Sequence, residues 1–94
     1  MNFEVLGKKC EFRRLTAKEG LELKNAMLKA SATNEFKSLD DLMFEVLKID
    51  DDFVKSPIAI EPIFGVNSAN AICEISVKFM EYAQSFLPNS LKSL

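Results

Sequence analysis

The residue types that carry most enzymatic chemistry are scarce in this chain of 94 residues. It contains no histidine, and therefore lacks the commonest general base and the usual nitrogen ligand of zinc. The two cysteines, Cys10 and Cys73, lie far apart in the sequence and cannot hold a metal ion alone. The glycines are scattered at positions 7, 20 and 65, so there is no glycine-rich phosphate-binding loop. We predict that the protein is not an enzyme and uses no cofactor or metal.

The densest acidic run is Asp50, Asp51 and Asp52, and carboxylate oxygens are the ligands that calcium prefers. An EF-hand loop requires acidic residues at alternate positions, a central glycine and a distal glutamate, and the spacing here does not match. We interpret the three aspartates as the solvated end of a helix.

The only basic cluster consists of Lys8, Lys9, Arg13 and Arg14, with Phe12 beside it. Basic residues next to an aromatic ring are typical of platforms for single-stranded nucleic acid. The formal net charge of −2 favours the other interpretation, in which these side chains are solvated or paired with nearby acids. We expect no nucleic-acid binding.

Charge is spread unevenly along the chain. Residues 1–30 carry seven Lys/Arg and four Glu (+3), residues 31–61 three Lys and eight Asp/Glu (−5), and residues 62–94 two of each sign (0), which gives −2 in total. One interpretation is a basic hairpin that packs beside an acidic helix in one molecule. The other is a charge dipole that orients copies of the chain. In that case the candidate self-association residues are Arg13, Arg14, Asp50, Asp51 and Asp52.

The elements that would position these residues begin with a β-hairpin over residues 2–14. Phe3 and Val5, and then Cys10 and Phe12, alternate with polar residues, which is the period of a half-buried strand. Gly7-Lys8 is the expected centre of the turn. A two-stranded hairpin alone is marginal in water, so its apolar face must pack against helices.

A helix over residues 17–30 follows the hairpin. Thr16 and Glu19 have the spacing of a capping box, in which each side chain binds a free backbone N–H of the other residue. Leu23, Met27 and Ala30 share one face, which we predict to be buried.

Two further helices are predicted, over residues 39–51 and 68–87. The first would be capped by Ser38 and Asp41, and the second would bury a stripe that includes Cys73 and end at Pro88. The fold class is mostly α (α+β): an N-terminal β-hairpin followed by about three α-helices in a small bundle. Residues 1–88 would form a single domain, and residues 89–94 a mobile tail.

The segment of residues 55–65 is apolar but contains Pro57 and Pro62, which disfavour a regular helix. One interpretation is an extended stretch that lies over the core. The other is a partly exposed apolar strip that a partner covers. In the second case the candidate partner-binding residues are Ile58, Ile60, Ile63 and Phe64.

We expect a cytoplasmic location. The sequence has no secretory signal pattern, no apolar run approaching the roughly 18 residues of a membrane span, and no cysteine framework. A core of this size is small, and oligomerisation is a common remedy, so we also expect a homo-oligomer.

The stretch 7–23, GKKCEFRRLTAKEGLEL, resembles the start of the tail assembly chaperones of long-tailed bacteriophages and prophages. Members of that family often begin with a small hairpin of the pattern G-K-x-y/c-x-f/l-R, followed by L-T-x-x-E and a helical body. The acid-rich block of residues 36–47 and a final amphipathic helix also fit. The segment with Pro57 and Pro62 has no counterpart in the pattern.

The resemblance implies a non-enzymatic chaperone. Such proteins bind the long helical tape-measure protein, keep it soluble, help to recruit tail-tube subunits in the host cytoplasm, and often form oligomers. The alternative is a small cytosolic helical adaptor or regulator, of the antitoxin-like kind, that binds another protein. The acidic second helix argues against a helix-turn-helix reader of DNA.

Overall fold

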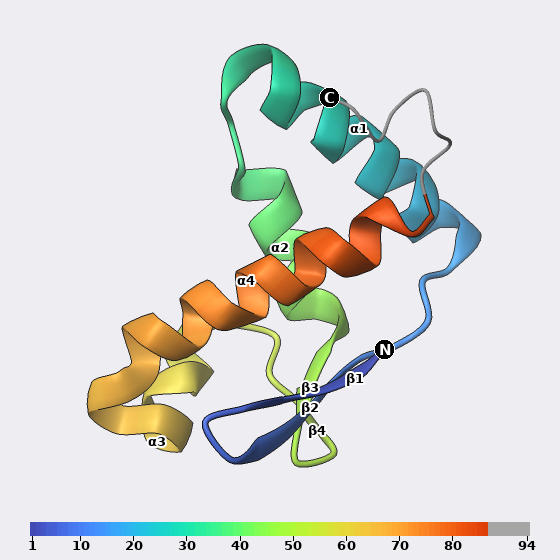
Figure 1. Ribbon diagram of the computed structural model, residues 1–94. Coiled ribbons are helices and arrows are strands. Elements are labelled where there is room, and N and C mark those ends of the chain that lie inside the picture. Colours follow the sequence, from blue (N-terminus) through green and yellow to red (C-terminus); the bar gives the residue numbers. More distant parts are fainter. Residues whose placement is uncertain (87–94) are drawn as a thin grey trace.

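The computed structural model describes residues 1–86, in which a four-stranded antiparallel sheet packs against helices (Figure 1). The strands are β1 (Asn2–Val5), β2 (Lys8–Phe12), β3 (Leu47–Ile49) and β4 (Asp52–Phe53), and they lie side by side in that order. The expected α+β class is therefore confirmed. The predicted tail, residues 89–94, lies outside the described residues.

Three longer helices complete the fold: α1 (Ala17–Thr33), α2 (Lys37–Val46) and α4 (Ser68–Gln84). In Figure 1 the sheet lies at one end of the molecule and α1 at the other, while α4 runs between them. The helix predicted over residues 17–30 is confirmed and is slightly longer. Its capping box is present as expected, with both the Thr16 and the Glu19 side chains engaged.

The helix predicted over residues 39–51 is wrong in its second half. Helix α2 ends at Val46, and β3 and β4 form a second hairpin whose turn residues are Asp50 and Asp51. Both aspartates have positive φ, 50° and 70°, as a two-residue type I′ turn requires. The acidic run therefore makes a β-turn rather than a helix end. The predicted Ser38 cap is also absent, because α2 begins at Lys37 after Phe36, which gives no side-chain cap.

The first hairpin is confirmed, with its turn shifted by one residue. Val5 pairs with Lys8, so Leu6 and Gly7 form the turn, with φ of 48° and 82°. The expected apolar side is buried at Val5, Cys10 and Phe12 and partly buried at Phe3.

Helix α4 buries only part of the predicted stripe. Phe79 and Ala83 of that stripe are buried as expected, but Cys73 is exposed and Ile72 is only partly buried. Ala71 and Ile75 enter the core instead. Apolar residues occupy most of this helix's circumference, so the helical period alone fits more than one face. Packing against the sheet and α2 selects the face. The predicted end of this helix at residue 87 lies outside the described residues, within which the helix ends at Gln84.

The segment predicted as extended is helical instead. It consists of a 3₁₀ turn η1 (Pro57–Ile60), the short helix α3 (Glu61–Phe64) and a second 3₁₀ turn η2 (Gly65–Asn67). Both prolines occupy the first turn of their helix, where a missing N–H costs nothing, and the Ser56 hydroxyl accepts a hydrogen bond from the Ile58 N–H. The prolines therefore start helices here rather than prevent them.

Aromatic rings join the sheet to α4 at the centre of the core. The Phe12 ring lies 5.2 Å from that of Phe79 and 5.5 Å from that of Tyr82 between ring centroids. Phe3 extends this cluster toward the edge of the sheet at 4.8 Å from Phe12, and Phe86 extends it beyond Tyr82 at 4.8 Å. The hairpin and the last helix are thereby packed into one core.

Candidate protein-binding surfaces

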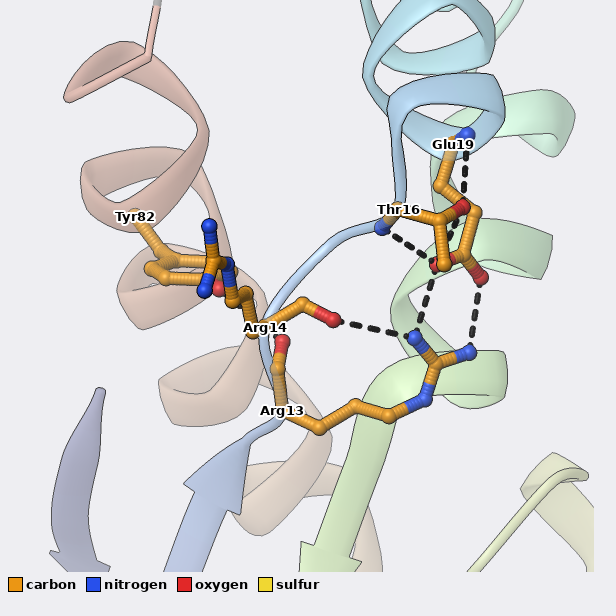
Figure 2. A network of polar contacts seen from close by, with 5 residues as sticks. All are labelled: Arg13, Arg14, Thr16, Glu19 and Tyr82. Atoms are coloured by element: carbon orange, nitrogen blue, oxygen red, sulfur yellow. Dashed lines mark hydrogen bonds and ion pairs between the residues drawn. The ribbon is translucent and has the colours of Figure 1, made fainter.

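The junction between β2 and α1 is fixed by a network of charged and polar groups (Figure 2). Both terminal nitrogens of Arg13 donate to the Glu19 carboxylate at 2.7 Å, while Glu19 also accepts from the Thr16 N–H at 3.0 Å. The hydrogen bond from Arg13, helped by those from Thr16, lowers the pKa of the Glu19 carboxyl to about 2. The Glu19 side chain is only 13% exposed, so water screens the pair weakly.

Helix α4 is tied to the same junction. The Tyr82 hydroxyl donates to the Arg13 carbonyl oxygen at 2.9 Å, and burial raises the pKa of this phenol (Figure 2). The residues of the R-x-x-T-x-x-E pattern that carry the family resemblance thus join strand, helix cap and α4. Their role in this chain is to hold the fold together.

The basic hairpin meets the acidic turn within one molecule. Lys8 lies 3.8 Å from Asp50, and Lys48 lies 3.9 Å from Glu11, while Arg13 is engaged with Glu19. Of the five residues considered for self-association, Arg14, Asp51 and Asp52 remain exposed without such an ion pair among the described residues. Of the candidate residues, Asp50 is thus paired with the basic hairpin of the same molecule, whereas Arg13 is paired with Glu19 of its own segment.

The apolar segment of residues 57–66 is divided between core and surface. Ile60 is 0% exposed and Phe64 is buried, so these two proposed contact residues belong to the core. Ile58 is 82% exposed, and Ile63 is partly buried. Val66, which the sequence analysis did not single out, is the most exposed apolar side chain of the described residues. Ile58, Ile63 and Val66 are therefore the accessible part of this segment.

A second apolar surface lies between the edge strand β1 and α4. A groove of about 300 Å³ runs there, and Val77 is 60% exposed beside it. The groove is lined by Glu4, Val5, Cys73, Glu74, Val77 and Lys78. This surface was not predicted, because Cys73 was expected on the buried face of the helix.

The two cysteines have opposite environments. Burial, reinforced by the nearby Asp50 carboxylate, raises the pKa of the Cys10 thiol to about 11. Cys73 is exposed on α4. Neither has the electropositive surroundings that activate a nucleophilic thiol.

Within residues 1–86, no three His, Cys, Asp or Glu side chains are grouped so that they could bind a metal ion. A groove of about 490 Å³ lies between α1 and α2, and both polar and apolar side chains line it: Glu22, Asn25, Ala26, Lys29, Ser38, Asp41, Leu42 and Glu45. Asp41 in that wall is bound to Lys37 at 2.9 Å.

No helix in the described part of the chain is long and apolar enough to cross a lipid bilayer. Comparison of the chain with protein-family models, with curated proteins and with solved structures found no match.

Proposed function

We propose that this chain is a non-enzymatic phage tail assembly chaperone, which binds the tape-measure protein and helps to recruit tail-tube subunits in the host cytoplasm. The observation that carries the proposal is the exposure of Ile58 (82%) and Val66 (101%) on a short helical segment. The resemblance of residues 7–23 to the family supplies the identity of the partner.

The segment of residues 57–66 is suited to hold an apolar helix. Ile60 and Phe64 fix it to the core, so the exposed Ile58 and Val66 side chains and the partly buried Ile63 are presented on an ordered backbone. Side chains that are already positioned lose little conformational entropy when a partner covers them. An amphipathic helix of a tape-measure protein has the apolar face that would cover such a surface.

The first test is genetic. The DNA downstream of this gene is sequenced, and we expect a very long reading frame rich in helical sequence close by. The product of that frame is then co-expressed with the tagged chain. We expect it to be captured and to stay soluble. Metabolic or regulatory genes in its place would contradict the chaperone role and favour a small helical adaptor.

Point variants then locate the surface. Ile58→Asp and Val66→Asp are expected to abolish capture of the tape-measure product while the circular dichroism spectrum and melting temperature are unchanged. Leu21→Asp is the matched control, because Leu21 is 56% exposed but lies on α1. Undiminished capture by both Ile58→Asp and Val66→Asp would contradict the proposed site.

A further inference from the structure

The strand β1 forms an open edge of the sheet. Two hydrogen bonds join Met1 and Phe12. The Phe12 N–H donates to the Met1 carbonyl oxygen at 2.9 Å, and the Met1 amino group donates to the Phe12 carbonyl oxygen at 3.1 Å. Hydrogen-bonded pairs alternate along an antiparallel ladder, so Phe3 and Val5 also direct their backbone groups toward β2. The N–H and C=O groups of Asn2 and Glu4 therefore point away from the sheet, toward solvent.

The opposite edge is protected in the ways that usually prevent strand addition. Strand β4 has two residues, Asp52 and Phe53, and follows directly on the Asp50-Asp51 turn. The Lys48 ammonium lies 5.2 Å from the centre of the Phe53 ring, and that of Lys55 lies 6.0 Å from it. Strand β1 has no proline and no lysine, and of its four residues only Glu4 is charged. Strand addition is thus favoured at β1 alone among the described strands.

The apolar surface next to β1 is incompletely covered by residues 1–86. Phe3 contacts Phe12 in a tilted arrangement but is only partly buried, because within this range no strand lies on its other side. The groove between β1 and α4 adds the exposed Val77 and Cys73. An added strand would extend the aromatic cluster of the core and bring its own apolar side chains against α4.

We propose that a second copy of this chain pairs with β1, strand to strand and antiparallel, about a two-fold axis at Phe3. In this register the outward N–H and C=O groups of Asn2 form hydrogen bonds with the C=O and N–H groups of Glu4 in the other copy. Phe3 faces Phe3 of the other copy as a close, non-hydrogen-bonded pair, a favourable position for two aromatic rings. The two sheets become one sheet of eight strands.

Charge selects this occupant and this register. With the axis at Phe3, each Glu4 lies opposite the neutral Asn2, and no like charges oppose each other in β1. An axis at Glu4 would place two carboxylates directly opposite, which is destabilising. The groove wall carries Glu4, Glu74 and Lys78, so each copy brings charges of both signs to the contact. The strand is therefore complementary to itself.

This contact lies between copies of the chain and is separate from the surface at residues 57–66. It gives the self-association expected of the proposed function a specific interface. The two can fail independently, since loss of tape-measure capture reports on Ile58 and Val66, and loss of the dimer reports on β1.

The first experiment measures the mass of the purified full chain by sedimentation over a concentration series. Wild type is expected to be a dimer that dissociates on dilution. Glu4→Pro removes the outward N–H and leaves the bonds to β2 intact, so it should weaken the dimer about tenfold or more. Val77→Asp should weaken it too, whereas Val66→Asp, outside the groove, is the matched control. A wild-type monomer at every concentration, or a dimer indifferent to both variants, overturns the proposal.

The register is tested by disulfide formation between copies in a Cys10→Ala, Cys73→Ser background, because Cys10 lies directly opposite Phe3 on β2 and would compete for a new thiol there. Phe3→Cys is expected to form a cross-linked dimer on mild oxidation, because only position 3 faces itself across the axis. Asn2→Cys alone and Glu4→Cys alone should not, but a mixture of the two should. Equal cross-linking at positions 2, 3 and 4 would overturn the register.

Discussion

Single residues in this chain explain why a sequence pattern can be distinctive without marking a binding site. Arg13, Thr16 and Glu19 are the polar positions of the family-like pattern, and all three are used in one network that caps α1 and fixes it to β2 (Figure 2). The spacing of Thr16 and Glu19 was enough to predict the cap. The Arg13–Glu19 pair was not predicted, because it depends on how the strand leaves the sheet.

Neutralising Glu19 should reveal this network. Glu19→Gln is expected to lower the free energy of unfolding at pH 7 by at most about 3 kcal/mol, since the carboxyl pKa falls from 4.5 to about 2 on folding. Because the pKa of Glu19 is lower in the folded protein, ionised Glu19 stabilises the fold at pH values above 4.5. This stabilisation is lost as the pH falls from 4.5 toward 2. The free energies of unfolding of wild type and Glu19→Gln, measured with urea, should therefore approach each other as the pH is lowered from 7 to 2. Glu22→Gln, exposed on the same helix, is the control; an equal loss there would contradict a specific role.

The two thiols should react at very different rates. A pKa of about 11 leaves roughly one Cys10 in ten thousand as thiolate at pH 7, and the side chain is also buried. An aromatic disulfide reagent is expected to modify Cys73 at once and Cys10 only in denaturant. The Cys73→Ser variant should show no fast phase. A fast phase that survives in this variant would mean that Cys10 is accessible.

At the scale of elements, local signals were sufficient for β1, β2 and α1 but not for the hairpin of β3 and β4. The apolar residues from Leu39 to Leu47 follow a helical period, and Leu47 with Ile49 also fits the period of a strand. The deciding contact is the pairing of Phe12 with Leu47 across the sheet. That pairing joins residues far apart in sequence, so no local pattern indicates it.

The turn between β1 and β2 can be improved. Leu6 has a φ of 48°, a left-handed conformation that is unfavourable for leucine, and precedes Gly7 in a two-residue turn. Leu6→Asn creates Asn-Gly, the preferred pair for this turn, and should raise the free energy of unfolding by about 0.5–1 kcal/mol. Thermal unfolding measures the gain. Leu6→Ala is the control and should give no comparable gain; equal stabilisation by both would contradict the conformational argument.

For the whole molecule, the division of the apolar segment between core and surface decides which variants are informative. Ile60→Asp places a carboxylate at a site with 0% exposure, which should cost several kcal/mol and unfold a domain of ordinary stability. Ile58→Asp, two residues away and 82% exposed, should keep the native melting temperature. Calorimetry of the pair tests the fold itself. A folded Ile60→Asp protein would show that the segment does not belong to the core.

The response to salt distinguishes the two possible modes of self-association. Contact through exposed charges, such as Arg14 with Asp51 or Asp52 of another copy, should weaken strongly between about 0.1 M and 1 M NaCl, as the screening length falls from about 10 Å to 3 Å. Pairing at β1 depends on backbone hydrogen bonds and apolar burial, which salt does not screen. We therefore expect the dimer dissociation constant to change less than about threefold over this range. Dissociation in salt, with Glu4→Pro behaving as wild type, would instead place the interface at the charged residues.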